Sequence, residues 1–256
     1  MSMSDVHPKA RIGANVSIGS FSSVAEDVEI GDGTWIGPNV TIMDGARIGK
    51  NCSIFPGAVI SAIPQDLKYQ GEKTTAEIGD NTTVRECCTI NKGTTDRMKT
   101  SLGSNSLVMA YSHLAHDCQV GSHVILANNA TIAGHVVIED YAILEGLVAV
   151  QQFVTIGSHS FITGGSLVRK NVPPYVKAAR EPLSYAGVNS VGLRRRGYSV
   201  EDVHTIEDIY RILFVKGVNI TNAVKEIEKE VPDGPFRKEI LEFIEQSPKG
   251  IIRGPL

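Results

Sequence analysis

The sequence predicts a mainly β protein: a parallel β-helix of hexapeptide repeats over residues 1–174, then a linker and an α-helical domain over residues 175–256. Three observations support this fold class. An aliphatic residue recurs at almost every sixth position, a glycine-rich column follows it directly, and the hydrophobic period becomes helical beyond residue 190.

The aliphatic column runs from Val6 to Val168. Of its 28 positions, 25 hold Ile, Leu or Val, and the exceptions are Asp66, Glu72 and Asp96. The next column holds nine glycines, and four places after each aliphatic 26 of 28 residues are Ala, Ser, Thr, Cys or Val. A six-residue period drifts around an α-helix, and strand alternation has a period of two. A coil with three flat sides explains the pattern, because three hexads close one 18-residue coil.

Two stretches, 61–77 and 91–101, interrupt the columns, which resume in phase at Ile78 and Leu102. We expect loops that leave the coil at a corner, and irregular loops on a rigid scaffold are where function concentrates. The repeat is expected to end at the Pro173-Pro174 pair, because proline cannot donate to a strand ladder.

The C-terminal part has helical signals. Ser199 with Asp202 is a plausible N-terminal cap pair, and the hydrophobic stripe after it is expected to end near Gly217. Two further helices are expected over 221–231 and 235–246, split by two prolines. The stripe consists of Val203, Ile206, Ile209, Tyr210 and Leu213.

Composition restricts the function classes. The net charge of −3 favours neither nucleic acid nor an anionic membrane as a partner. The N-terminus lacks the apolar region of a signal peptide, and no apolar run is long enough to span a bilayer. The four cysteines lack framework spacing, which indicates free thiols in a reducing compartment. The sequence therefore predicts a cytoplasmic protein.

Stacking of the coils brings chemically useful residues together. Residues 18 apart lie above one another, so Gly134 is expected above His116, His135 above Asp117, and Gln152 one coil further. An imidazole base, a carboxylate beside it and a backbone N–H are what acyl transfer to a hydroxyl requires. The nearest thiol belongs to Cys118 in the small-residue column, so direct attack by the acceptor is the simpler mechanism.

Two other interpretations of the histidines remain open. A histidine on a β-helix surface is most often a solvated side chain without a role. His113, His116 and His135 could instead supply imidazoles to zinc, as in carbonic anhydrases built on this kind of prism. Asp117 and Gly134 suit acyl transfer better than a metal centre, so we expect no metal.

Several segments resemble the acyl-carrier-protein–UDP-N-acetylglucosamine O-acyltransferases, which begin lipid A synthesis. The resemblance covers nearly the whole chain and implies a left-handed coil. It also implies a homotrimer, UDP-N-acetylglucosamine as acceptor, no cofactor, and an acyl carrier protein bearing phosphopantetheine as donor. The segments are Gln65–Tyr69, His113–Cys118, Ile125–Thr131, Ala133–His135, Asn171–Tyr175, Gly187–Asn189 and Leu193–Gly197.

The resemblance also implies residue roles. His116 would be the general base, Asp117 its orienting partner, and Gly134 the donor to the oxyanion. Asp66 and Lys68 would reach the sugar nucleotide across a subunit boundary. His113, His135 and Gln152 would line the same pocket. The nucleotide end would be bound by Asn189, Arg195 and Arg196.

Surface cations and two glycines complete the expected site. The triplet Arg194–Arg196 alone would be a solvated basic face, but its place in the motif favours a role with the diphosphate. In the family, the position matching Gly164 limits acyl length, and Gly146 stacks in the same column, so we expect a long 3-hydroxyacyl chain. Residues expected to dock an acidic carrier protein are these arginines with Arg169, Lys170, Lys177 and Arg180.

Two departures from the family pattern concern the acceptor. Gln151 stands where several members have His, and Val191 replaces a common acidic residue. The acceptor atom is therefore open between a 3-hydroxyl and a 3-amine. The related N-acyltransferases typically have an extra N-terminal domain, whereas the hexads here begin at Val6, which favours the O-acyltransferase. A structural or metal-binding β-helix without transferase activity is the third alternative.

Overall fold

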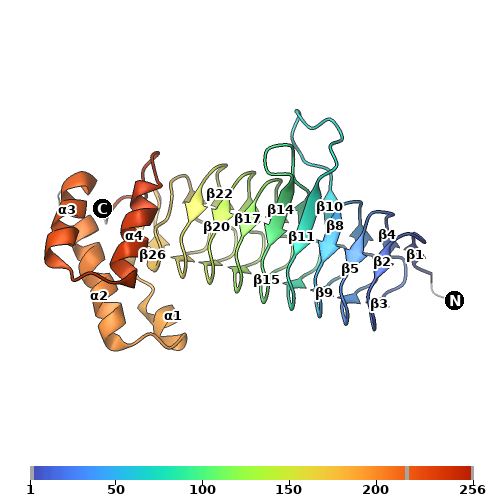
Figure 1. The fold of residues 1–256 in the computed structure, drawn as a ribbon, viewed down its shortest axis with the longest axis horizontal. Helices are drawn as coiled ribbons and strands as arrows, with labels where there is room; N and C mark the ends of the chain where they lie inside the picture. The colour runs from blue at the N-terminus through green and yellow to red at the C-terminus, as the bar shows by residue number, and fades with distance from the viewer. Residues whose placement is uncertain (1–2, 217–218, 255–256) are drawn as a thin grey trace.

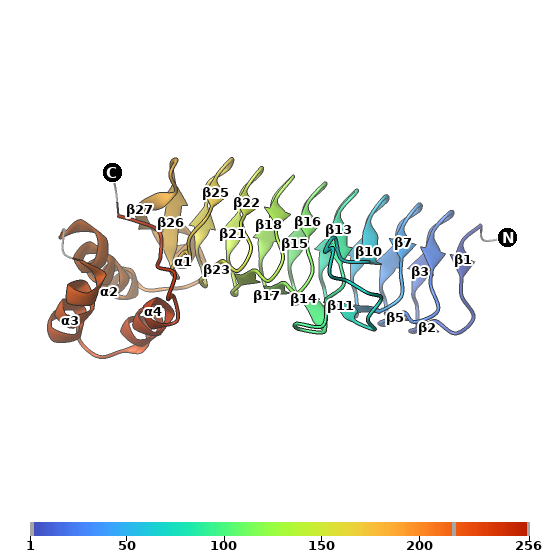
Figure 2. The same ribbon diagram turned by 90° about the horizontal axis from the view of Figure 1, so that it is seen from above.

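The computed structural model describes residues 3–216 and 219–254. The molecule is a long rod of stacked coils with the N-terminus at one end and a cluster of helices at the other (Figure 1). Seen from above, the coils follow one another along the rod in sequence order (Figure 2). None of the described helices combines the length and hydrophobicity that crossing a bilayer requires.

Three sheets form the three sides of the rod. The first sheet contains β1 (Asp5–Val6), β4 (Ser23–Val24), β7 (Thr41–Ile42), β10 (Val59–Ala62), β13 (Thr89–Asn91), β16 (His113–Leu114), β19 (Thr131–Ile132), β22 (Ala149–Val150) and β25 (Leu167–Val168). The second contains β2 (Arg11–Ile12), β5 (Glu29–Ile30), β8 (Ala46–Ile48), β11 (Thr75–Ile78), β14 (Lys99–Leu102), β17 (Gln119–Val120), β20 (Val137–Ile138) and β23 (Thr155–Ile156). The third contains β3 (Ser17–Ile18), β6 (Trp35–Ile36), β9 (Ser53–Ile54), β12 (Thr83–Val84), β15 (Leu107–Val108), β18 (Ile125–Leu126), β21 (Ile143–Leu144), β24 (Phe161–Ile162), β26 (Val176–Ala179) and β27 (Ser184–Val188).

The register confirms the predicted 18-residue coil. In the first sheet His113 pairs in parallel with Thr131, and Thr131 pairs with Ala149. The aliphatic column points inward, and side chains such as Ile54 and Leu126 are fully buried. Each such side chain contributes about 1.5–3 kcal/mol through removal from water, so the stacked column stabilises the rod along its length.

The two loops are inserted without loss of phase. Val59 pairs with Thr89, 30 residues on, so the first loop adds 12 residues to an 18-residue coil. Thr89 pairs with His113, 24 residues on, so the second loop adds six. Both irregular segments are narrower than expected, at 63–74 and 92–98, because β10, β11 and β14 lengthen beside them. The loops project from one side of the rod near β10 and β14 (Figure 1).

Strand pairing continues beyond residue 174, contrary to the expectation that the prolines end it. β26 pairs in parallel with β24, with Phe161 opposite Lys177, and β27 then adds antiparallel to β26. Pro174 lies in the turn before β26, where no ladder N–H is needed.

The C-terminal domain contains α1 (Ser190–Arg195), α2 (Val200–Tyr210), the π-helical turn η1 (Arg211–Val215), α3 (Ile220–Glu230) and α4 (Pro235–Glu245). The predicted cap is confirmed: Asp202 N–H donates to Ser199 Oγ at 3.0 Å, and Ser199 N–H donates to Asp202 Oδ2 at 2.9 Å. The predicted stripe is buried throughout. Gly217, where this stripe was expected to end, lies outside the described residues, and α1 was not anticipated.

The helical domain docks on the last coils of the rod. The Tyr210 hydroxyl donates to the Pro174 carbonyl at 2.6 Å, and the Ser158 hydroxyl donates to Glu239 of α4 at 2.5 Å. The Tyr175 hydroxyl bonds to the same carboxylate. These bonds fix the helices relative to the last coils of the rod.

Candidate active site

Each coil has three corners, and the site is built on one of them. The first corner joins the first and second sheets and includes residues 115–118, 133–136 and 151–154 in successive coils. The second corner joins the second and third sheets (121–124, 139–142, 157–160), and the third joins the third and first (127–130, 145–148, 163–166).

His116 and Asp117 form a buried pair at the first corner. His116 Nδ1 lies 2.8 Å from Asp117 Oδ2, and the two side chains are 6% and 0% exposed. Thr94 donates to both carboxylate oxygens, through N–H to Oδ1 at 2.9 Å and through its hydroxyl to Oδ2 at 2.6 Å. Arg97 N–H donates to Oδ1 at 3.2 Å. The carboxylate therefore accepts four hydrogen bonds.

These bonds set the charge of Asp117. Burial alone would raise the pKa of its carboxyl, but the hydrogen bonds from Thr94, His116 and Arg97 outweigh burial and hold the pKa below its ordinary value. An ionised Asp117 requires His116 Nδ1 to be the donor. His116 Nε2 therefore has the free lone pair that a general base needs.

Gly134 faces this nitrogen from the next coil. A Cβ built on Gly134 would lie 2.7 Å from both Nε2 and Cε1 of His116, so a larger residue would displace the ring. No hydrogen bond within the described residues uses the Gly134 N–H. The register thus places the imidazole and an available backbone donor side by side, as the sequence predicted.

The other expected histidines surround this pair. His135 packs edge-on against His116 with ring centroids 5.0 Å apart, and His135 N–H donates to the His116 carbonyl at 3.1 Å. His113 Nδ1 lies 2.7 Å from Thr89 Oγ1, and burial, with a smaller effect of nearby His116, lowers the pKa of His113. Gln152 occupies the next coil of the same corner with its side chain exposed.

The first loop contributes to the same region. Asp66 and Lys68 line a cavity of about 280 Å³ together with His135 and Phe153 of their own chain. Contacts within one chain therefore suffice to bring these two residues to His135. Asp66 Oδ1 accepts the Lys68 N–H at 3.0 Å, which fixes the turn between them.

The possible metal ligands differ from those expected. Ligand atoms of His116, Asp117 and His135 lie within 4.8 Å of one another, whereas His113 is not among them. The Asp117 oxygens are committed to four protein donors, one of which is His116 Nδ1. Even a catalytic zinc site needs three available protein ligands, and the occupied Asp117 oxygens leave fewer, so this arrangement suits proton transfer better than metal binding.

The structure does not bring all the predicted site residues together within one chain. Asn189 caps α1 beside the second corner, where its side-chain amide donates to the His159 carbonyl at 2.9 Å. Arg195 is exposed on α1. Gly146 and Gly164 lie at the third corner, where a Cβ on Gly164 would come 3.1 Å from the Gly146 carbonyl oxygen.

Arg196 differs from the expected free guanidinium. It lies over the Tyr141 ring at 5.3 Å and donates to the Tyr141 carbonyl at 3.0 Å. Burial is the main cause that lowers its pKa. Arg196 therefore holds α1 against the second corner, while Arg195 stays available to a ligand.

Sequence reasoning missed four residues of the first corner: Thr94, Asp96, Arg97 and Phe153. Asp96 Oδ2 lies 3.0 Å from His135 Nδ1, although the pair is not aligned as a hydrogen bond. Phe153 stacks on His135 with centroids 4.6 Å apart. The interruption of the hexads marked the second loop as functional, but its side-chain directions are not encoded in the repeat.

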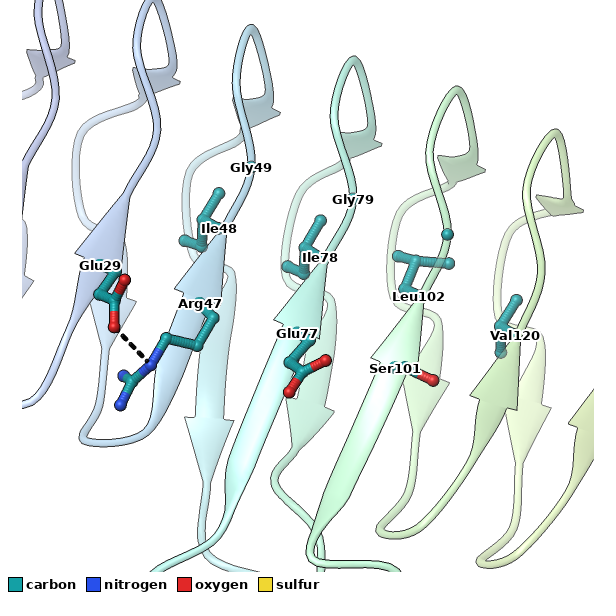
Figure 3. A pocket seen from close by; sticks show the side chains of 11 residues that line it. Glu29, Arg47, Ile48, Gly49, Glu77, Ile78, Gly79, Ser101, Leu102 and Val120 are labelled. Atoms are coloured by element: carbon teal, nitrogen blue, oxygen red, sulfur yellow. Dashed lines mark ion pairs between the residues drawn. The ribbon is translucent and has the colours of Figure 1, made fainter.

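A larger groove, of about 690 Å³, lies on the second sheet and contains none of these residues (Figure 3). Its rim includes the ion pair between Arg47 Nε and Glu29 Oε1 at 3.0 Å (Figure 3). Its carboxylates, Glu29 and Glu77, are not paired with a histidine, so its size alone does not make it the reaction site. The lining residues are Glu29, Arg47, Ile48, Gly49, Glu77, Ile78, Gly79, Ser101, Leu102, Gly103 and Val120.

Comparison with known proteins tests the resemblance. Residues 171–252 match the family "Udp N-acetylglucosamine O-acyltransferase; Domain 2", and residues 27–62 and 99–134 match the bacterial transferase hexapeptide repeats. An acyl-[acyl-carrier-protein]–UDP-N-acetylglucosamine O-acyltransferase from Herminiimonas arsenicoxydans is 43% identical over 253 residues, covering 97% of each chain. The protein of the same name from Aliivibrio fischeri is 44% identical over 255 residues, again covering 97% of each.

Solved structures agree over the whole rod. A UDP-N-acetylglucosamine acyltransferase from Bacteroides fragilis superposes with a TM-score of 0.97 at 45% identity, covering 99% of both chains. One from Francisella novicida gives 0.95 at 39% identity, covering 100% of this chain and 94% of that one. The predicted left-handed parallel β-helix is confirmed. The chain therefore belongs to the family of acyl-[acyl-carrier-protein]–UDP-N-acetylglucosamine O-acyltransferases.

Proposed function

We propose that this chain transfers a 3-hydroxyacyl group from an acyl carrier protein to the 3-hydroxyl of UDP-N-acetylglucosamine, as a cytoplasmic step of lipid A biosynthesis. The names of its relatives supply the donor and acceptor classes. The observation that carries the proposal is the first corner, where His116 Nδ1 is held 2.8 Å from Asp117 and Nε2 faces Gly134.

The reaction follows from these positions. His116 Nε2 takes the proton of the acceptor hydroxyl, whose oxygen attacks the thioester carbonyl. Asp117 stabilises the resulting imidazolium without itself taking the proton. The Gly134 N–H donates to the tetrahedral oxyanion. When the intermediate collapses, the C–S bond breaks and the phosphopantetheine thiolate receives the proton from His116.

A covalent route through cysteine is disfavoured by the nearest thiol. Cys118 is fully buried, and burial raises its pKa to about 12, so almost no thiolate exists near neutral pH. Its thiol donates a hydrogen bond to the Ala133 carbonyl, with Sγ 3.1 Å from the oxygen. Direct attack by the acceptor therefore needs no protein nucleophile.

The spread of the site residues supports a homotrimer. The expected site residues lie around three different corners: His116 at the first, Arg195 beside the second and Gly164 at the third. One substrate can therefore contact all three residues only if a second copy of the chain supplies at least one of them. Cyclic packing of prisms brings unlike corners together in every interface. We propose that the nucleotide end comes from the neighbouring copy, where Arg195 contacts the nucleotide while Asn189 and Arg196 hold α1 in place.

A subunit-mixing experiment tests this arrangement. His116→Ala and Arg195→Ala chains are each expected to be strongly impaired. Co-expressed with different tags and purified as mixed trimers, they should regain activity, because about one in three interfaces of a mixed trimer would combine the two intact residues. If mixed trimers stay as inactive as the parents, the site does not combine these residues from two copies.

The carrier protein is proposed to dock near the last coils. Arg169, Lys170, Lys177 and Arg180 are all exposed there, and their charge complements an acidic partner. No cofactor beyond the donor's phosphopantetheine is required by the mechanism, since the base, the orienting carboxylate and the oxyanion donor all come from the chain.

One assay tests the reaction and its specificity together. The protein is incubated with 3-hydroxyacyl carrier proteins of increasing chain length and either UDP-N-acetylglucosamine or its 3-amino analogue, and product masses are read. We expect ester product, with long chains preferred because Gly146 and Gly164 present no side chains to the acyl group. Faster transfer of medium chains would contradict the length proposal, and amide product alone would reassign the acceptor atom.

A further inference from the structure

The second loop folds back onto the orienting carboxylate of the proposed base. Thr94, which is 8% exposed, lies at the start of this loop, and both its N–H and its hydroxyl donate to Asp117. The hydroxyl reaches Oδ2 at 2.6 Å, and His116 Nδ1 meets the same oxygen at 2.8 Å. One carboxylate oxygen is thus shared by the threonine and the imidazole.

We propose that Thr94 is a positioning residue for acyl transfer, which acts on His116 through the Asp117 carboxylate. This inference rests on the proposed function, in which His116 is the base. Each oxygen of the Asp117 carboxylate accepts two hydrogen bonds, which together restrict the carboxylate to one orientation. In that orientation it holds the His116 ring with Nε2 directed at the acceptor. Without the hydroxyl, the carboxylate can turn about its side-chain bonds, and Nε2 then spends less time aimed at the acceptor.

Thr94 is itself held before any substrate binds. Gly93 N–H donates to the Thr75 carbonyl at 3.1 Å, and the Thr74 hydroxyl donates to the Gly93 carbonyl at 2.6 Å. Met98 N–H closes the loop on the Thr94 carbonyl at 2.8 Å. A Cβ on Gly93 would lie 2.4 Å from Lys99 N, so the chain can make this close turn only at glycine.

Arg97 fixes the backbone of Asp117 as well as its carboxylate. Its guanidinium donates to the Asp117 carbonyl at 2.9 Å, and its N–H donates to the side chain at 3.2 Å. Asp117 has a positive φ of 58°, a conformation that few residues adopt readily. The loop therefore holds Asp117 at both its backbone and its side chain, and Thr94 provides the only hydroxyl among these donors.

The test compares Thr94→Val, which removes the hydroxyl at nearly constant shape, with Thr94→Ser, which keeps it. We expect Thr94→Val to lower kcat about 10–100-fold, as loss of an outer partner of a catalytic group does, with KM for the acceptor changed less than about twofold. Thr94→Ser should retain kcat within about threefold. A merely structural threonine would lower the amount of folded protein, and kcat per folded molecule would then stay unchanged.

Thr82→Val is the matched control for loss of a buried hydroxyl. Thr82 is 0% exposed and donates to the Gly103 carbonyl at 2.9 Å, away from the first corner. Its kcat should equal that of the original protein. Thermal unfolding of all variants shows whether each one is folded at the assay temperature, and kcat is referred to the folded fraction.

A double-mutant cycle with His116→Ala separates the two proposals. If Thr94 acts only through His116, Thr94→Val should have no further effect in the His116→Ala background. Near-normal activity of His116→Ala would reject the proposed base, whatever Thr94 does. An inactive His116→Ala beside a fully active Thr94→Val would leave the base intact and reject the positioning role.

Discussion

The first and second corners of the rod have the same backbone and different chemistry. Both place residues at positive φ in successive coils, and both stack rings along the rod. At the first corner His135 stacks on Phe153 at 4.6 Å, and at the second His123, Tyr141 and His159 stack at 4.5 and 4.7 Å. Stacked imidazoles alone therefore do not make a reaction site.

What differs is the environment that other segments supply. At the first corner carboxylates lie beside the imidazoles: Asp117 of the corner itself is 2.8 Å and Asp96 of the second loop is 3.0 Å from an imidazole nitrogen. At the second corner the helical domain brings Arg196, and burial, followed by this positive charge, lowers the pKa of His159 to about 4. The comparison teaches that an anionic partner orients one imidazole, as the proposed proton transfer requires, while burial beside a cation keeps the other neutral.

The largest expected difference between the corners is catalytic. His116→Ala should lower kcat about 10²–10⁴-fold, because the proposed general base is lost. His123→Ala, at the second corner, removes an exposed ring of the same type and should leave kcat within about twofold. Steady-state rates with acyl carrier protein donor and UDP-N-acetylglucosamine measure both, and comparable rates for the two variants would overturn the distinction.

A smaller effect is expected from the glycine that faces His116. Gly134→Ala keeps the backbone N–H but places a methyl 2.7 Å from His116 Nε2, so the ring must move and kcat should fall about 100-fold. Ser122→Ala is the control, because residue 122 holds at the second corner the place that residue 116 holds at the first. Ser122→Ala should be fully active. An active Gly134→Ala enzyme would mean that the ring and this glycine do not act together.

The smallest effect concerns stability at the second corner. Folded His159 stays neutral down to about pH 4, whereas its ordinary pKa is 6.5, so the unfolded chain binds one more proton between these values. His159 therefore contributes stability that is complete above pH 6.5 and is lost as the pH falls towards 4. His159→Asn should flatten the unfolding free energy against pH in this window by up to one proton. Denaturant unfolding from pH 4.5 to 7.5 measures the slope, and equal slopes would contradict the assignment.

The sequence predicted the scaffold because one repeat determines both the register and the core. The aliphatic column predicted that Gly134 lies against His116, because residues 18 apart stack in adjacent coils of constant length. Thr94 and Arg97 lie in the second loop, where the hexad repeat is interrupted and no longer predicts which residues stack. Their contacts depend on how a seven-residue loop, 92–98, closes on itself, and no column constrains that.

The C-terminal end shows the same limit. The cap at Ser199 and the buried stripe of α2 follow from local sequence and were predicted. The strand beyond Pro174 and the inward turn of Arg196 depend on docking between distant segments. Periodicity indicated that helices follow the rod, but the contacts with Tyr141 and His159 arise only when α1 packs there.

Because of their lengths, the two inserted loops can change without disturbing the register of the coils. Twelve and six residues are whole numbers of hexads, so every later coil resumes with its aliphatic facing the interior. Excising residues 93–98 would return the chain to a regular repeat, in which each coil still rests on its neighbours. We expect such a shortened protein to keep the triangular framework while its orienting aspartate loses three donor groups. A rod of this kind can thus change how the side chains of a corner are oriented by changing what is inserted there, with the remaining coils untouched.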